Sequence, residues 1–194
     1  MLESRITDKK LAPTMSASLP TLETARLLLR PPAPEDFDAW AEFCADAEAQ
    51  RFLGGALDRA SAWRNICVAA GAWTVRGFSF FSVIEKASGR WIGRVGPWQP
   101  EGWPGTEVAY GLAKQAWGKG YAHESAGAAI AWAFNHLGWT EVVHCIDPAN
   151  APSQRVATRL GARILRRTRL PAPLHWEVEV WGQTRDAWQA RNGC

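Results

Sequence analysis

The chain has 194 residues, of which 47% are hydrophobic and 21% charged, and its formal net charge is +3. A chain of this length and composition folds into a globular domain with a sizeable core, which excludes a disordered protein. The weak net charge gives no reason to expect a nucleic-acid partner. No apolar run reaches the roughly 18 residues that would indicate a membrane span.

Residues 1–20 carry charges but no apolar segment, so we expect a disordered tail and not a secretory signal, followed by a single domain over residues 21–194. Met15 is an alternative start to Met1. The four cysteines show no C-x-x-C spacing, and no histidine lies at zinc-finger distance from them. We therefore expect reduced thiols, no metal site and a cytoplasmic location.

The sequence pattern in the first third of the domain predicts one strand and two helices. Residues 26–32 form a short apolar run that two prolines stop, which predicts a strand. Residues 33–52 begin with acidic residues suited to a first helical turn and then show apolar residues at helical spacing. A second helix is expected over residues 58–75, capped by Asp58 or Ser61. Its expected apolar face consists of Trp63, Ile66, Cys67 and Ala70.

The rest of the chain alternates strands and helices. Residues 78–86 and 90–98 predict a hairpin, and residues 106–113 predict a third strand beside it. A helix is expected from the glycines before residue 121 to about His136, where Gly138 ends it. A strand over 140–147, a helix over 150–161 and a hairpin of 162–170 with 175–184 follow. This order predicts an α/β (α+β) fold with a mixed sheet of six to seven strands and helices on its faces.

Two further segments have more than one interpretation. Arg163, Arg166, Arg167 and Arg169 alternate with other residues, and we favour the solvated face of a strand over a phosphate-binding patch. The segment PWQPEGWPG at 97–105 sets tryptophans among prolines and glycines. It forms either a wall of a binding cleft or simple packing against the domain.

The segment KQAWGKG at 114–120 lies between a predicted strand and a predicted helix. Glycine at positions 118 and 120 permits positive φ and lets backbone N–H groups approach a ligand. The first N–H groups of a helix lack intrahelical partners and attract anions, and Lys114 and Lys119 add positive charge. The alternative is a tight turn that only needs glycine, since neither the P-loop nor the full G-x-G-x-x-G pattern is present.

Three motifs occur in the same order as in a known family. The sequence resembles the GNAT superfamily of acetyl-CoA-dependent N-acetyltransferases, whose Q/R-x-x-G-x-G/A signature matches Gln115, Gly118 and Gly120. The segments LETARLLLRP (22–31) and EVAYGLAKQAWGKGYAHES (107–125) are similar to the ribosomal-protein N-terminal (alanine or serine) acetyltransferase branch. The segment NAPSQRVATRLG (150–161) matches a third motif of that branch, so the resemblance covers residues 22–182.

The resemblance implies a sheet that splays between its fourth and fifth strands to admit acetyl-CoA. Leu112, Ala113 and Lys114 would pair with the pantetheine arm, and Asn150 and Ser153 would approach the thiol end. The expected pyrophosphate site consists of Gln115, Ala116, Trp117, Gly118, Lys119, Gly120 and Tyr121.

Acetyl transfer to an amine requires a base, an oxyanion donor and a proton for the thiolate. Glu107 is the candidate base or else an exposed strand residue, and the amide of Leu112 or Ala113 is the candidate oxyanion donor. Ser153 is the candidate acid or else a helix cap. Ala157 stands where many relatives have the tyrosine acid. Gly111 and Ala162 also replace bulkier residues, which widens the cleft unless other side chains fill the space.

The expected acceptor is a primary amine, such as a peptide or protein N-terminus. The alternatives are a small amine (aminoglycoside, polyamine or amino acid) or a non-catalytic acyl-CoA-binding regulator. Trp176 and Trp181 make the terminal hairpin a candidate homodimer edge.

Overall fold

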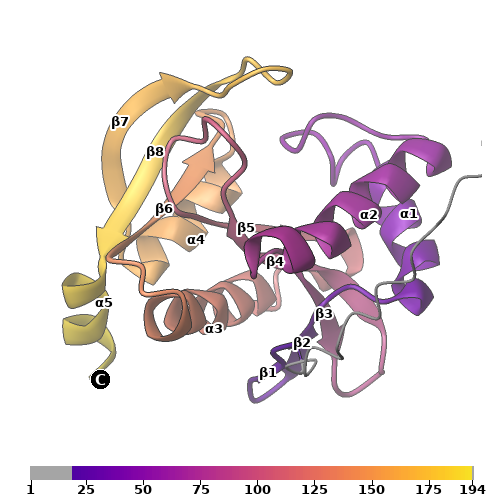
Figure 1. Cartoon of the computed structure of the whole chain (residues 1–194), viewed down its shortest axis with the longest axis horizontal. Helices are drawn as coiled ribbons and strands as arrows, with labels where there is room; N and C mark the ends of the chain where they lie inside the picture. Colours follow the sequence, from indigo (N-terminus) through magenta and orange to yellow (C-terminus); the bar gives the residue numbers. More distant parts are fainter. Residues whose placement is uncertain (1–18, 194) are drawn as a thin grey trace, which may run out of the picture.

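The computed structural model describes residues 19–193, and the expected tail at 1–20 therefore lies almost entirely outside the described residues. Within the described part, eight strands form one sheet in the order β1-β2-β3-β4-β5-β6-β8-β7. Neighbouring strands in this part are antiparallel except for β5 and β6, which are parallel. The sheet is mixed, as predicted (Figure 1).

The described sheet has one strand more than the predicted six to seven. The additional strand arises because Leu22 and Glu23 pair with Leu29 and Leu28, and two residues are too few to show an alternating pattern. The strands are β1 (Leu22–Glu23), β2 (Leu27–Arg30), β3 (Phe81–Glu85), β4 (Trp91–Trp98), β5 (Glu107–Leu112), β6 (Glu141–Ile146), β7 (Arg163–Arg169) and β8 (Glu177–Thr184).

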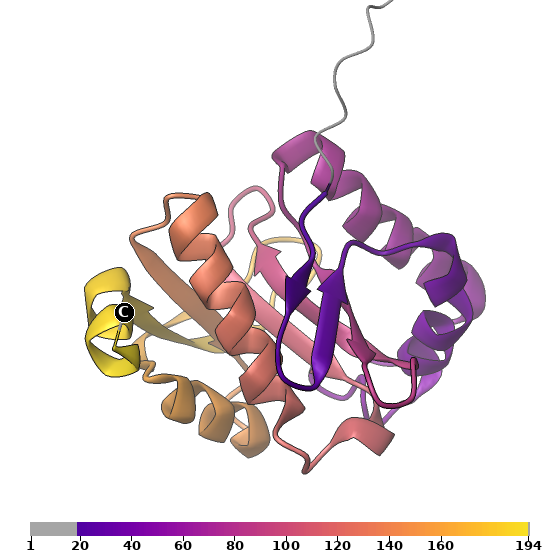
Figure 2. The same cartoon turned by 90° about the horizontal axis from the view of Figure 1, so that it is seen from below.

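Helices cover both faces of the sheet, so that two large cores and one small buried cluster form in the described part of the chain. The helices are α1 (Phe37–Ala45), which follows a 3-10 turn at Pro34–Asp36, α2 (Arg59–Arg76), α3 (Tyr121–His136), α4 (Ala151–Leu160) and α5 (Arg185–Asn192). Helix α3 packs along β4 and β5, and Figure 2 shows it crossing the sheet. On the other face, Phe80 and Trp91 pack against α1 and α2.

The predicted apolar face of α2 was wrong. Trp63, Cys67 and Ala70 are exposed, whereas Ala62 and Ala69 are buried together with Ile66 and Trp73. Small alanine side chains face the sheet because they let the helix approach closely, so size decides this face more than hydrophobicity does. Asp58 is the N-cap, as one of the two alternatives proposed, and its carboxylate accepts a hydrogen bond from the Ser61 amide at 2.7 Å.

The arginines of β7 lie on a solvated strand, as predicted: all four are exposed. Arg167 pairs with Glu179 and Arg169 with Glu177. Helix α5 was not predicted, and it begins where the Thr184 hydroxyl accepts a hydrogen bond from the Ala187 amide. None of the helices within residues 19–193 combines the length and the hydrophobicity that a bilayer span requires.

Candidate active site

Strands β5 and β6 separate soon after they begin to pair. Their register contains one pair of opposite residues, Glu107 with Val143. After this pair, side chains of one strand form hydrogen bonds with the backbone of the other, in place of the backbone–backbone hydrogen bonds of a regular sheet. The Cys145 amide donates to the Glu107 carboxylate at 2.8 Å, and Nδ1 of His144 lies 2.7 Å from the Val108 carbonyl oxygen. The fourth and fifth strands expected from the sequence, residues 106–113 and 140–147, correspond to β5 and β6, and they separate as predicted.

The phase of the β4–β5 ladder shows which backbone groups of β5 face this opening. The Ala113 amide donates to the Ile92 carbonyl at 2.9 Å, so it points to β4. Since amide direction alternates along a strand, the amide of Leu112 points to the opening. Of the two candidate oxyanion donors, Leu112 is the one whose amide faces the opening. Its carbonyl already accepts a hydrogen bond from the Trp117 indole at 2.7 Å.

The loop before α3 has the geometry of an anion site. Gly118 and Gly120 have φ values of 74° and 81°, in the left-handed region that favours glycine. Gly120 is the N-cap of α3 and provides no side-chain cap, so the first amides of the helix lack that partner. A Cβ atom built at Gly118 would meet nothing within 4 Å. The glycine is thus not required by packing inside the protein, which leaves room for a ligand.

Other residues of this segment hold the loop in place. Tyr121 is buried, and its hydroxyl donates to Glu85 at 2.7 Å. Lys114 pairs with Glu48, and Lys119 lies 3.9 Å from Glu85.

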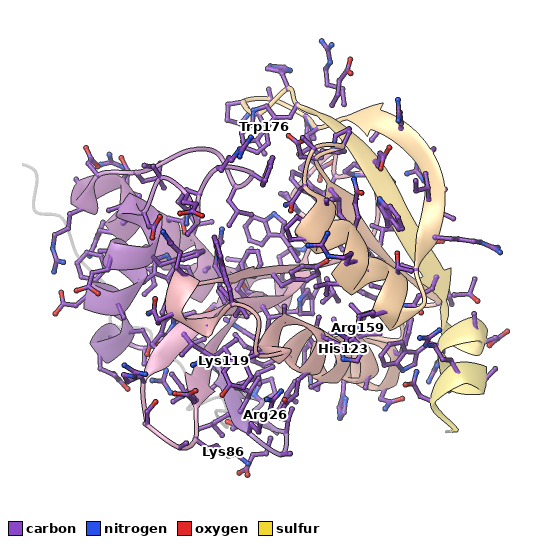
Figure 3. All side chains as sticks on the ribbon, turned by 180° about the vertical axis from the view of Figure 1, so that it is seen from behind. Arg26, Lys86, Lys119, His123, Arg159 and Trp176 are labelled. Atoms are coloured by element: carbon purple, nitrogen blue, oxygen red, sulfur yellow. The ribbon has the colours of Figure 1, made fainter. Side chains whose placement is uncertain are left out.

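Arg26 is a residue that the sequence interpretation missed, although it lies in the first family-like motif. Its guanidinium donates to the Lys119 carbonyl at 2.9 Å and lies over the Tyr121 ring at 4.5 Å. Figure 3 shows Arg26 beside Lys119. Arg26 also forms an ion pair with Glu124. These contacts join β2 and the residue before it to the loop and to the first turn of α3.

A cavity of about 580 Å³ occupies the opening between β5 and β6 and continues over the neighbouring face of β4. The α1–α2 loop and the β7–β8 loop both border it, and Figure 1 shows these loops at the same end of the molecule. The 97–105 segment is a wall of this cavity, which was one of its two predicted interpretations. The side chains that line the cavity include Asn65, Phe80, Arg94, Trp98, Trp103, Glu107, Tyr110, His144, Asn150, Ser153 and Trp176.

Glu107 is buried in the wall of this cavity, with 4% of its surface exposed. Its two oxygens accept hydrogen bonds from the Trp103 indole at 2.6 Å and from the Cys145 amide. Burial raises the pKa of Glu107 to about 7, against the effect of these two hydrogen bonds. A carboxyl group with this pKa exchanges a proton near neutral pH, and each oxygen keeps a lone pair for a further partner.

The model of the family described as "Acetyltransferase (GNAT) domain" matches residues 26–163. The chain belongs to this family. An acetyltransferase structure from Agrobacterium tumefaciens shares 31% identity with a TM-score of 0.77, covering 87% of this chain and 96% of that chain.

Two Bacillus proteins are also similar to this GNAT acetyltransferase. The "Uncharacterized protein YkkB" of Bacillus subtilis is 36% identical over 87 residues, which are 44% of this chain and about half (51%) of that protein. The "Uncharacterized N-acetyltransferase p20" of Bacillus licheniformis is 28% identical over 144 residues, 73% of this chain and 81% of that protein. Solved ribosomal-protein acetyltransferases share its fold as well.

Membership of the GNAT family makes the protein an acetyl-CoA-dependent N-acetyltransferase, and the site fits that co-substrate. A diphosphate needs N–H donors and open space, and the glycine loop provides both at the start of α3. An extended arm needs a strand edge, which the separation of β5 and β6 provides. Within residues 19–193, no three His, Cys, Asp or Glu side chains lie close enough together to hold a metal ion.

Ser153 does not serve as the cap of α4. The Asn150 carboxamide is the N-cap and accepts a hydrogen bond from the Ser153 amide at 3.2 Å. The hydroxyl of Tyr110 donates to the Ser153 carbonyl at 3.1 Å. The Ser153 side chain therefore lines the cavity without a capping role.

The residues that depart from the family pattern are enclosed by neighbours. A Cβ atom at Gly111 would lie 3.0 Å from both Leu53 and Phe43, so these side chains fill the space and the cleft is not widened there. Ala162 packs with Ala157 and Trp181 in a small buried cluster, where the tryptophan replaces the missing bulk. Ala157 is fully buried and carries no hydroxyl.

Proposed function

We propose that this acetyltransferase moves the acetyl group of acetyl-CoA to a primary amine by direct attack of the amine on the thioester. The observation that carries the proposal is the position of Glu107 in a cavity that passes through the opening between β5 and β6. Its pKa of about 7 suits a group that must accept a proton at neutral pH.

The backbone groups around the opening would bind different parts of acetyl-CoA. Gly118, Lys119 and Gly120 would hold the diphosphate, and the strand edge of β5 would hold the pantetheine arm. Bound acetyl-CoA supplies a thioester, which an amine can attack. The Leu112 amide would donate a hydrogen bond to the carbonyl oxygen, which gains negative charge as the amine attacks.

Two side chains would move protons. Glu107 removes a proton from the entering ammonium group, because an amine attacks only in its neutral form. Ser153 gives its hydroxyl proton to the departing thiolate, since Ala157 has no group that can do so. It recovers a proton from the attacking nitrogen, which must lose one as the C–S bond breaks and the amide forms, and Glu107 releases its proton to solvent.

The acceptor is either a small amine or the N-terminus of a peptide. The cavity volume of about 580 Å³ is in the range of small-molecule sites, which supports a small amine. The resemblance of residues 107–125 to the ribosomal-protein branch supports a peptide N-terminus. A non-catalytic regulator would bind acetyl-CoA and release no thiol.

A screen of amines and N-terminal peptides tests this proposal. Free coenzyme A is followed with a thiol reagent and acetylated products by mass. We expect thiol release that depends on the acceptor and is lost in Glu107→Gln. Binding of coenzyme A without release in the presence of every acceptor would contradict the enzyme and support the regulator.

The remaining assignments are proposals about the whole protein. We propose that residues 21–194 act as one domain in the cytoplasm, which the free thiols of Cys44, Cys67 and Cys145 support. A homodimer edge at the terminal hairpin is supported by β7, which lies at the end of the sheet and exposes 51% of Ile164 and 45% of Leu165. Light scattering would detect the dimer.

A further inference from the structure

Arg94 lies in the wall of the cavity with its charged group between aromatic rings. It is a residue of β4, on the face covered by α1 and α2. Its guanidinium lies 4.4 Å from the centre of the Phe80 ring and 5.6 Å from the Trp40 ring. Phe80 in turn stacks on Trp98 at 4.9 Å. The rings fix the faces of the guanidinium and leave the N–H donors at its edge for other partners.

Within the part of the chain that the structure describes, the charge of Arg94 has no acidic partner. Among residues 19–193, the Arg94 side chain makes no ion pair and no hydrogen bond, and its backbone pairs with Gly111 in the sheet. Burial lowers the pKa of Arg94, and among the described residues the Cys44 thiol is the one ionisable group that opposes this effect. Burial raises the pKa of that thiol, so it is neutral at pH 7 and does not balance the cation. The half-buried guanidinium therefore borders the cavity without a counter-charge, which an anionic group of a ligand can supply.

Asn65 offers a second donor beside the same ring. Its carboxamide oxygen accepts a hydrogen bond from the Trp40 indole at 3.0 Å, which leaves its NH₂ group free to donate to a ligand. Both Asn65 and Arg94 line the cavity and both contact Trp40. Together they form a site for an anionic oxygen group.

This anion site is on the same face of the sheet as the base. Arg94 pairs with Gly111 and Trp98 pairs with Glu107, so Arg94 and Glu107 are four positions apart along adjacent strands. That spacing is about 13 Å between backbones, which the two side chains shorten. A small molecule can therefore reach both groups at once. The wall between them is largely apolar and includes Phe80 and Trp98.

We propose that Arg94, with Asn65, binds a carboxylate of the acceptor, so that the substrate is an apolar amino acid or short peptide with both a free amine and a free carboxylate. The inference rests on the proposed function and narrows its acceptor. A polyamine or an aminoglycoside has no group for Arg94 and would bring positive charge towards it. A long protein chain would not place its own carboxylate there.

The activity test compares apolar amino acids and dipeptides as free acids and as methyl esters. We expect wild-type enzyme to prefer the acids by about 10- to 100-fold in kcat/KM, the range for a hydrogen-bonded charge pair. The amine of an ester is less basic, which alone would favour the esters. Arg94→Gln should lose the preference and still acetylate the esters, and Arg94→Lys should keep part of it. The control is Arg64→Gln, which changes an exposed arginine of the same cavity.

A binding measurement makes the inference independent of turnover. Calorimetry with phenylbutyrate as the probe should show binding to the wild type and to Arg64→Gln, and at least about tenfold weaker binding to Arg94→Gln. Equal affinity for all three proteins, or equal use of acids and esters by the wild type, would overturn the carboxylate site. If no amine of any kind is acetylated while phenylbutyrate still binds through Arg94, the proposed function fails and the anion site stands.

Discussion

Replacing Trp103 with phenylalanine removes one hydrogen bond from Glu107 and keeps an aromatic ring in the 97–105 segment. The bond joins the Trp103 indole N–H to a carboxylate oxygen at 2.6 Å, and it lowers the pKa of Glu107. A hydrogen bond to a charged group contributes about 1.5–3 kcal/mol, and one pKa unit corresponds to about 1.4 kcal/mol. The substitution should therefore raise the pKa of Glu107 from about 7 by roughly 1–2 units.

This shift has a defined effect on the pH profile of the enzyme. Half of the Glu107 side chains are ionised at pH 7 when the pKa is about 7, and only about 1–10% when it is raised by one or two units. In Trp103→Phe, kcat/KM at pH 7 should fall by about 5- to 50-fold and recover towards the wild-type value in alkaline buffer.

The assay follows coenzyme A release from pH 5.5 to pH 10 with one acceptor. Ionisation of the acceptor affects both enzymes equally, so the displacement between the two profiles reports Glu107. Trp176→Phe is the matched control, because Trp176 also lines the cavity but makes no hydrogen bond to Glu107. Superimposable profiles for Trp103→Phe and the wild type would refute the assignment of Glu107 as the base.

Three further substitutions test separate parts of the site. Glu107→Gln should lower kcat by about 10²- to 10⁴-fold, and its affinity for coenzyme A, measured by calorimetry, should not change. A kcat near the wild-type value would exclude Glu107 as the base. Ser153→Ala should lower kcat by about 10²-fold or more, and a change within about twofold would exclude its role as the acid. His144 is buried with a pKa lowered to about 4 by burial, so the unfolded chain binds the proton more tightly and acid favours unfolding. Glu107 has the opposite effect because its pKa is raised, so His144 is tested by comparison with His144→Asn. Between pH 7 and pH 4 in urea titrations, the free energy of unfolding of His144→Asn should change by up to about 3 kcal/mol in its favour relative to the wild type, and the same pH dependence in both proteins would show that His144 does not contribute.

Much of the fold follows from local patterns in the sequence. Helix α3 lies where it was predicted, with Ala126, Ile130 and Ala133 buried at helical spacing, and the meander of β3, β4 and β5 follows the predicted hairpin and third strand. The face of α2 could not be predicted in this way, because an alanine-rich helix shows little contrast between its faces. Ala62 faces the sheet while Trp63 is exposed, an arrangement decided by the space between helix and sheet.

The candidate site was predictable where a motif is continuous in the chain. The glycines at 118 and 120 indicated a loop with positive φ before a helix, which the structure contains. The choice between the amides of Leu112 and Ala113 was not predictable, because it depends on the phase of the β4–β5 ladder. Arg94 was missed for a related reason: the absence of an acidic partner is a property of the packed structure, and no spacing in the sequence reports it.

The central claim is that the backbone amides before α3 hold the diphosphate of acetyl-CoA. Calorimetry of coenzyme A with Gly118→Val and Gly138→Val tests it, because these glycines have similar φ values, 74° and 67°, and a Cβ atom at either position would meet no other atom within 4 Å. Gly138 lies just after the opposite end of α3 and serves as the control for backbone strain. We predict at least about a tenfold loss of affinity for Gly118→Val and wild-type affinity for Gly138→Val. Equal affinities for both variants and the wild type would contradict the claim.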